Sequence, residues 1–156
     1  MSGILAIEPL ALHPQAIPIL CEWFEAEWPS YYGPDGPGSA QNDLHAYANQ
    51  GSLPVGVVAL DAGKVCGVAA LKVESIASHR HLLPWAAAGI VHPSLRGQGI
   101  GRLLLYALEQ EARKLGFDRI YCGTSTAHGL LQRSNWELIE FIDHEGEFLG
   151  IFSTSL

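Results

Sequence analysis

Hydrophobic and polar positions in the first third of the chain predict a strand and two helices. The apolar run over residues 4–8 is typical of a short strand. Apolar side chains then recur every three or four residues over 14–28 and predict a helix, with Ile17, Leu20, Phe24 and Trp28 on one face. A second helix is predicted over about 40–49, capped by Ser39 or a neighbour. Residues 30–39, dense in Gly and Pro, predict a loop that faces a substrate rather than links two domains.

The middle of the chain changes to a strand pattern. Residues 54–60 and 65–74 flank the turn sequence Asp61–Lys64 and predict a β-hairpin. A polar connection over 76–82 leads to the apolar run 84–91, which predicts a buried strand in spite of the weak β propensity of its alanines. This part of the chain therefore supplies three consecutive strands.

The last third opens with the longest helical pattern. A helix with one apolar face is predicted from about Gly99 to Leu115, and Gly116 is its expected stop. Residues 119–123 predict another strand, and residues 127–134 predict a short helix capped by Ser125 or Thr126. The chain ends in a predicted hairpin that turns at 144–146.

These elements run in the order β-α-α-β-β-β-α-β-α-β-β. That order predicts an α/β (α+β) fold in which helices flank a mixed sheet. The chain has 156 residues, of which 48% are apolar, so it can bury a substantial core and disorder is not expected. The length suits one domain, and we predict a single domain over residues 1–156.

Charge is unevenly distributed along the chain. The net charge is −7, and the first basic residue is Lys64, after all the acids that account for that excess. Contacts to phosphate need Lys or Arg, so a nucleic-acid-binding face on residues 1–63 is not expected. This acidic half suits a cationic partner, or else serves only solubility.

The sequence favours a cytoplasmic protein with neither a membrane partner nor a metal site. Its longest nearly apolar run, Leu82–Val91, is shorter than the about 20 residues that span a bilayer. The amino-terminal segment has no basic stretch and does not resemble a secretory signal. Cys21, Cys66 and Cys122 are far apart and lack zinc-ligand spacing, as is typical of buried thiols in a reducing compartment.

One segment, from Val91 to Arg102, indicates chemistry. A strand ends there, a glycine-rich turn follows, and the long helix begins. Such a turn points backbone N–H groups at one spot, with the positive end of the helix dipole behind them, and predicts an anion site. The glycines let a pyrophosphate approach the backbone, and Arg96 and Arg102 offer charge-assisted hydrogen bonds. A dinucleotide fingerprint would need glycine at 102, and a P-loop would need Lys-Ser or Lys-Thr after the last glycine, so neither fits.

The pattern that does fit is R-x-x-G-x-G, over residues 96–101. It follows Val91-x-Pro93 and precedes an amphipathic helix, and in this setting it resembles the acetyl-CoA signature of the GNAT N-acetyltransferases. The resemblance extends over essentially the whole chain, with Asn135-Trp136-Glu137 where the family usually has Gly-Phe-Glu. The short motifs EWP (27–29), LP (53–54) and PW (84–85) resemble a bacterial subgroup whose acceptor is unassigned.

This resemblance implies acetyl-CoA as the acetyl-donor substrate. It also implies a mixed sheet of about seven strands, flanked by four helices and splayed between the fourth and fifth strands. The pantetheine arm would lie in that splay against the fourth strand, where a backbone N–H would stabilise the oxyanion, and the turn would hold the pyrophosphate. The implied cofactor-binding residues are Ile90, Val91, Arg96, Gly97, Gln98, Gly99, Ile100, Gly101 and Arg102. Paired subunits are common in the family, so a homodimer is one expected state.

The catalytic acid and base are harder to assign. Many GNAT enzymes have a tyrosine acid in the helix after the fifth strand, where Leu131 stands here. That loss is tolerable because a thiolate with a pKa of about 8.5 is a fair leaving group. Substitutes, unless they serve only as caps or surface groups, are Ser125, Thr126, His128 and Ser134. Candidates for the base are Glu74, His79 and His81, with Glu25 and Glu27 near the first helix end.

The family places the first helices and the following loop on the acceptor side. Tyr31, Tyr32 and Trp85 are therefore expected to line the acceptor pocket, with Glu27 nearby. Aromatic faces next to carboxylates suit an ammonium group. The predicted acceptor is a primary amine on a cationic small molecule or basic peptide.

Three functional hypotheses follow. The first is an N-acetyltransferase that moves an acetyl group from acetyl-CoA to an amine. The second is an acyl-CoA-binding regulatory module with lost or weak catalysis, suggested by Leu131 and by a fourth strand without an acid. The third is an unrelated nucleotide-binding enzyme, which would prefer ATP or NAD to CoA.

Overall fold

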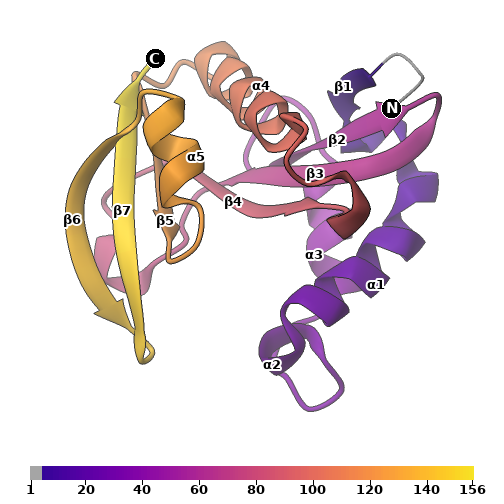
Figure 1. The fold of residues 1–156 in the computed structure, drawn as a ribbon, viewed down its shortest axis with the longest axis horizontal. Helices are drawn as coiled ribbons and strands as arrows, with labels where there is room; N and C mark the ends of the chain where they lie inside the picture. The colour runs from indigo at the N-terminus through magenta and orange to yellow at the C-terminus, as the bar shows by residue number, and fades with distance from the viewer. Residues whose placement is uncertain (1–4) are drawn as a thin grey trace.

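The computed structural model describes residues 5–156, so Ile4 of the predicted first strand lies outside the described residues. Seven strands form one mixed sheet in the order β1-β2-β3-β4-β5-β7-β6 (Figure 1). They are β1 (Leu5–Pro9), β2 (Val55–Asp61), β3 (Lys64–Lys72), β4 (Trp85–Val91), β5 (Arg119–Thr124), β6 (Glu137–His144) and β7 (Glu147–Ser155). The predicted fold class and both hairpins are confirmed.

Five α-helices accompany the sheet, one more than expected. They are α1 (Ile17–Glu27), α2 (Pro29–Tyr32), α3 (Ala40–Tyr47), α4 (Ile100–Lys114) and α5 (His128–Arg133). The extra helix, α2, occupies the start of the predicted loop because Pro29 suits a first helical position and Gly33 ends the turn with an N–H···O bond to Pro29. Within residues 5–156, no helix is both long and apolar enough to cross a membrane.

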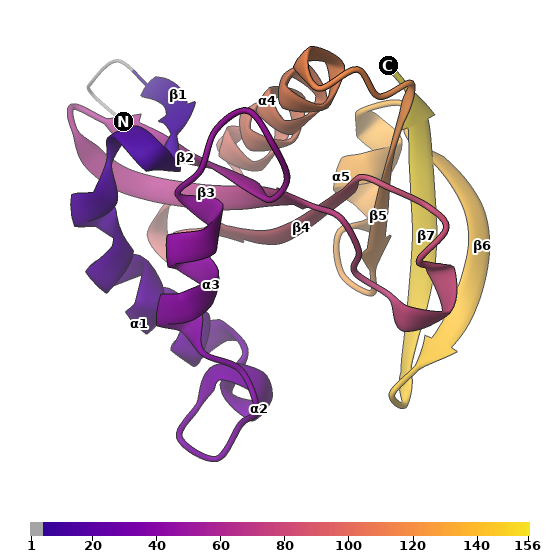
Figure 2. The ribbon, with the colours of Figure 1, turned by 180° about the vertical axis from the view of Figure 1, so that it is seen from behind.

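Helices cover both faces of the β1–β4 half of the sheet (Figures 1 and 2). Alternate residues of β2 point to opposite faces, so Val57 packs in the core under α4 and Val58 in the core under α1 and α3. The hairpin strands are buried along almost their whole length for this reason. The α1 helix begins after a 3-10 turn at Pro14–Ala16, slightly later than the apolar spacing predicts.

The sheet opens between β4 and β5, as the family resemblance implied. The parallel pairing of these strands consists, in the described chain, of the register pair Trp85↔Tyr121. β4 then bulges, since Ala88 and Gly89 together oppose a single residue of β3, and Ala88 has a φ of 55°. β5 instead stays paired with β7 along its whole length. On its β5 side, the backbone of β4 after Ala86 therefore faces a gap, while its other side stays paired with β3.

The loop that follows β5 differs from the prediction in its cap. Neither Ser125 nor Thr126 caps α5. Thr124 Oγ1 instead accepts hydrogen bonds from the backbone N–H groups of Thr126 and Ala127. β5 runs one residue further than expected, so the hydroxyl of its last residue holds the turn before α5, and α5 itself has no side-chain cap. Ser39 does cap α3, where its Oγ accepts from the Asn42 N–H.

Candidate active site

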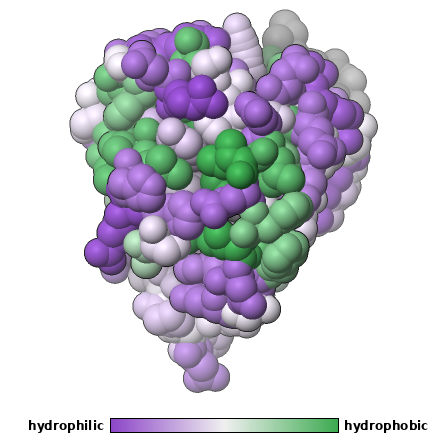
Figure 3. Space-filling view, turned by 90° about the vertical axis from the view of Figure 1, so that its left-hand side faces the viewer, coloured by the Kyte–Doolittle hydropathy of each residue, from purple (hydrophilic) through white to green (hydrophobic). Residues whose placement is uncertain are grey.

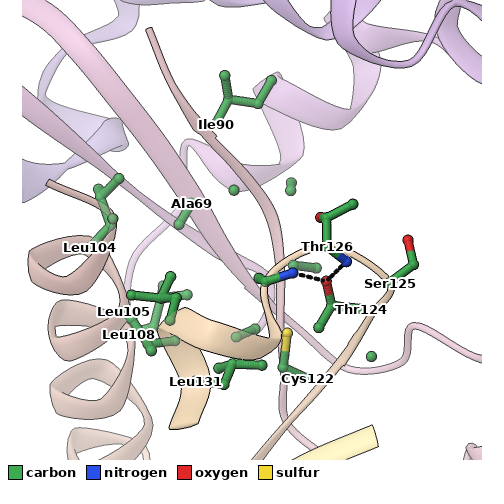
Figure 4. A pocket seen from close by; sticks show the side chains of 18 of the residues that line it. Ala69, Ile90, Leu104, Leu105, Leu108, Cys122, Thr124, Ser125, Thr126 and Leu131 are labelled. Atoms are coloured by element: carbon green, nitrogen blue, oxygen red, sulfur yellow. Dashed lines mark hydrogen bonds between the residues drawn. The ribbon is translucent and has the colours of Figure 1, made fainter. Parts of the chain in front are cut away.

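A cavity of about 400 Å³ follows the opening between β4 and β5 and extends to α4 and α5. Most of its lining is aliphatic, and the loop from β5 into α5 adds hydroxyl groups (Figure 4). The lining residues labelled in Figure 4 are Ala69, Ile90, Leu104, Leu105, Leu108, Cys122, Thr124, Ser125, Thr126 and Leu131. Such a cavity suits a slender, mostly apolar ligand arm with a few polar groups.

The glycine-rich turn lies at one side of this cavity. Val91, just before the turn, and Gly101, at its end, both line the cavity. Gly97 and Gly99 have φ values of 82° and 86°, a conformation that other residues rarely adopt. A Cβ atom on either glycine would meet nothing within 4 Å, so a ligand can reach the backbone there. Gly99 is the N-cap of α4 and has no side chain to accept from the first N–H groups of the helix.

The structure places the predicted cofactor-binding residues in three groups. Ile90, Val91 and Gly101 line the cavity. Gly97, Gln98, Gly99 and Arg102 form the exposed surface of the turn and the start of α4, while Ile100 is buried in the core and offers only its backbone. Their contact with a cofactor stays a prediction.

Arg96 is already engaged by the protein. Its Nε donates to the carbonyl of Val91 and its Nη2 to Glu27 Oε1, each at 2.9 Å. These bonds tie the turn to β4 and to the end of α1. An anion that binds Arg96 would have to displace Glu27 from it. In this structure Arg96 therefore stabilises the conformation of the turn.

A second cavity, of about 790 Å³, lies on the side of α2 and α3. One wall carries Tyr31, Tyr32, Asp43 and Tyr47 from α2 and α3. The β6–β7 turn, the end of β3 with the following loop, and Trp28, Pro54, Ala87 and Ala88 supply the rest of the lining. The β6–β7 turn lies across from α2 and α3 in the fold (Figures 1 and 2). The charged and titratable residues of its remaining lining are Lys72, Glu74, His144 and Glu145. The carboxylates outnumber the single lysine, so the cavity favours a cation.

The two cavities share three lining residues, Trp28, Ala87 and Ala88. Ala87 and Ala88 lie at the bulge of β4, where the sheet opens. A ligand arm between β4 and β5 and a second ligand beside α3 would therefore meet at this strand. This is the arrangement that a direct transfer between two bound substrates requires.

The position expected for a tyrosine acid offers no proton. Leu131 lines the first cavity and is 1% exposed within the main core cluster. Next to it in Figure 4 lies Cys122, whose thiol pKa burial raises to about 12, so this thiol is a weak acid. Of the other substitutes, Ser125 and Thr126 line the cavity, and the Ser125 hydroxyl donates to Glu147. His128 contacts the Thr124 carbonyl, and neither His128 nor Ser134 lines either cavity.

Three predicted site residues need correction. Trp85 is 0% exposed, its Nε1 donates to the Leu82 carbonyl, and it packs in a core cluster, so it does not line the acceptor side. His79 and His81 stack on each other in the loop after β3 and line neither cavity. His79 is held there by Glu140 of β6, a contact across 61 residues of sequence that local patterns do not reveal.

The remaining predicted residues lie closer to the cavities. Glu74 lines the second cavity and pairs with Arg80 at 3.3 Å, and Tyr31 and Tyr32 line it as well. Glu27 lines neither cavity but bonds to Arg96. Sequence reasoning missed Asp43 and His144, because only the assembled fold brings α3 and the β6–β7 turn to one cavity. The Ser39 cap, which fixes the start of α3, gave the one local signal for the placement of Asp43.

The splayed mixed sheet, the glycine-rich turn before α4 and the two adjoining cavities are typical of acyltransferases. The sequence profile of the acetyltransferase (GNAT) family matches residues 17–135, and the chain belongs to that family. GNAT enzymes take their acetyl group from acetyl-CoA. No curated protein sequence matches the chain significantly.

Solved structures share this fold at low sequence identity. An aminoglycoside 6'-N-acetyltransferase complexed with coenzyme A aligns with a TM-score of 0.76 and 14% identity, over 97% of this chain and 96% of that one. The protein yncA of Salmonella typhimurium, solved with its cofactor acetyl-CoA, aligns with a TM-score of 0.75 and 19% identity, over 98% and 94% of the two chains. The aminoglycoside 6'-N-acetyltransferase of Enterococcus faecium gives 0.75 and 15%, over 97% and 96%.

Proposed function

We propose that this chain is an N-acetyltransferase that moves the acetyl group of acetyl-CoA to a primary amine of a cationic small molecule or basic peptide. The observation that carries the proposal is the junction of two unlike cavities at Ala87 and Ala88. One cavity is aliphatic and adjoins a glycine turn suited to a pyrophosphate. The other is lined by tyrosines and carboxylates and suits an ammonium group.

The residues present fit acetyl-CoA, which supplies the activated thioester. The N–H groups of residues 97–102 would hold the pyrophosphate, and the backbone is open to a ligand at Gly97 and Gly99, which have no side chain and no neighbour within 4 Å of an added Cβ. After Ala86, the edge of β4 that faces β5 has no strand partner and would bind the pantetheine amides as a neighbouring strand would. A β4 N–H at the bulge would also donate to the carbonyl oxygen as its charge develops.

The acceptor amine must lose a proton before it attacks, because an ammonium has no lone pair. Of the histidines among residues 5–156, His144 is the one that lines either cavity. It lies at the end of β6 and is partly buried, and imidazole suits proton transfer near neutral pH. We assign the base role to His144, with Glu74 as the carboxylate alternative in the same cavity.

Turnover with a panel of amines tests the function. The purified chain is mixed with acetyl-CoA and one amine at a time, and release of free CoA thiol is followed. The panel spans monoamines, diamines, amino sugars, and peptides with basic or acidic amino termini. We expect turnover with cationic acceptors, and peptides with acidic amino termini to be the poorest substrates. The proposal fails if acetyl-CoA does not bind, or if ATP or NAD binds in preference to it.

One observation favours a second function, an acyl-CoA-binding regulatory module. Leu131 replaces the usual tyrosine, and its burial in the core leaves the first cavity without that hydroxyl. Calorimetry with acetyl-CoA and the thiol assay separate the two readings. Tight binding of acetyl-CoA with no turnover across the whole panel would favour the regulatory module.

The cellular location, the partners and the oligomeric state of the protein are also proposals. We propose a cytoplasmic enzyme, with no nucleic-acid or membrane partner, that forms a homodimer. Exposed apolar side chains on the β6–β7 hairpin support pairing of two copies (Figure 3), namely Leu138, Ile139, Phe141 and Phe148. Sedimentation velocity of the purified chain tests the dimer, and a concentration-independent monomer would contradict it.

A further inference from the structure

One wall of the second cavity is a carboxylate set among aromatic rings. Tyr32 Oη donates to Asp43 Oδ2 at 2.6 Å, which joins α2 to α3. Tyr47 lies one helical turn after Asp43 and is 3% exposed. Tyr32 packs on Phe24 of α1 and against Tyr31, so the position of the carboxylate is set by packed rings rather than by a mobile loop.

This wall carries one negative charge, which belongs to Asp43. Burial, together with the bond to Asp43, raises the pKa of Tyr32 above its usual range. Burial and the charge of Asp43 raise the pKa of Tyr47 to about 12. Both phenols are therefore neutral at physiological pH, and the wall presents one carboxylate among uncharged aromatic side chains. A carboxylate beside aromatic faces is a site for an alkylammonium group.

The ammonium group held there is not the group that is acetylated. A carboxylate partner stabilises the charged form of an amine and raises its pKa, so an amine bound by Asp43 keeps its proton. A protonated amine cannot attack a thioester. The acetyl group would arrive at Ala87 and Ala88, on the sheet floor of the cavity, whereas Asp43 belongs to the α3 wall. The cavity of about 790 Å³ also has room for far more than one amino group.

We infer that Asp43 and Tyr32 bind a second ammonium group of the acceptor, and that the acceptor is a diamine or polyamine. This inference rests on the proposed function and deepens it. The second ammonium anchors the molecule at α3, and its free amine reaches toward the bulge of β4. Asp43 then acts as a specificity-determining residue that touches the acceptor at a distance from the reacting atoms.

A matched pair of acceptors tests the anchor. 1,6-Diaminohexane and hexylamine have the same chain length and reactive amine, and differ only in the second ammonium group. We expect the wild-type protein to favour the diamine by about tenfold in kcat/KM, with shorter and longer diamines defining the best span. Asp43→Asn keeps the shape and can still accept from Tyr32. It should raise KM for the diamine about tenfold and leave the values for hexylamine and acetyl-CoA within about twofold.

Asp35→Asn is the matched control, because it removes the same charge from an exposed loop residue that lines neither cavity. Tyr32→Phe is a second variant that keeps the carboxylate and should weaken the diamine preference only partly. The inference is overturned if Asp43→Asn changes both amines equally, or if Asp35→Asn has the same effect.

Binding separates this inference from the proposed function. If no amine is turned over, calorimetry of 1,6-diaminohexane and hexylamine with the CoA-saturated protein replaces kinetics. If Asp43→Asn weakens binding of the diamine about tenfold, the ammonium site at Asp43 is supported even though the transfer activity is rejected. Equal affinity of the wild-type protein and Asp43→Asn for the diamine would reject the ammonium site at Asp43 as well.

Discussion

At the scale of single residues, His144 carries the sharpest prediction about catalysis. His144→Asn removes the proton acceptor and keeps a polar side chain of similar size at the β6–β7 turn. We expect kcat/KM for the amine at neutral pH to fall about 10²-fold, the lower end of general base effects. Affinity for acetyl-CoA should not change, because His144 lines the second cavity and not the first.

His81→Asn is the control for this prediction. His81 is exposed and lines neither cavity, so its loss should leave both kinetic constants and the pH profile as they are. Equal losses in His81→Asn and His144→Asn would mean that neither histidine is the base. Glu74→Gln would then be the next variant to measure.

Tyr47 predicts how stability depends on alkaline pH. Its pKa in the folded protein is raised to about 12, from an ordinary value near 10, chiefly by burial. Below pH 10 both states hold the proton, so its stabilising effect is complete. Between about pH 10 and 12 the unfolded state loses the proton first, and the free energy of unfolding falls by up to about 1.4 kcal/mol per pH unit from this group. Urea unfolding at pH 9, 10 and 11 measures the loss, and Tyr47→Phe should make it shallower.

At the scale of elements, substitutions in the turn between β4 and α4 distinguish the effect of backbone strain from the effect of ligand contact. Gly99 has a φ of 86°, so Gly99→Ala should cost about 1–2 kcal/mol of stability. A Cβ on Gly101 would lie 3.6 Å from Leu130 and 3.9 Å from Val91, which is ordinary contact. Gly101→Ala should therefore keep the fold and gain up to about 1 kcal/mol from the helix. Gly101→Leu extends into the cavity and should weaken acetyl-CoA binding at least about tenfold.

Thermal unfolding and calorimetry with acetyl-CoA check this series together. Gly101→Ala is the matched control for Gly101→Leu, because both remove the same glycine. If Gly101→Leu binds acetyl-CoA as tightly as Gly101→Ala does, the cavity between β4 and β5 does not hold the cofactor.

The elements could be predicted from the sequence wherever one pattern dominated. The hairpin of β2 and β3 follows from its alternation and turn, and α4 from its apolar face and flanking glycines. Trp85 could not be placed by its sequence neighbours, because the partners that bury it, such as Leu149 and Ile151, come from the far end of the chain. Asp43 and His144 lie about 100 residues apart and share a cavity only after the sheet has formed. Local spacing therefore predicted the glycine-rich turn and the start of α4 well and the lining of the second cavity poorly.

At the scale of the whole molecule, the charge difference between the two halves of the sequence corresponds only partly to the charges around the two cavities. The acceptor cavity takes Asp43 from the acidic first half, but Glu74 and Glu145 come from the balanced second half. The glycine turn has arginines on either side, at 96 and 102, and one of them is paired with Glu27 of the first half. The net charge is −7, so both proposed substrates approach a molecule that is anionic overall.

Salt should therefore affect the two substrates in opposite directions. The Debye length falls from about 30 Å at 0.01 M salt to about 8 Å at 0.15 M, which screens the attraction between the protein and a cationic acceptor. We expect kcat/KM for 1,6-diaminohexane to fall several-fold over this range. The kcat/KM for acetyl-CoA, an anion repelled by the net charge, should stay level or rise. Measuring both constants on the same samples excludes general inhibition by salt, since that would lower both. If the kcat/KM for 1,6-diaminohexane does not fall relative to that for acetyl-CoA over this range, the acidic excess does not guide the acceptor.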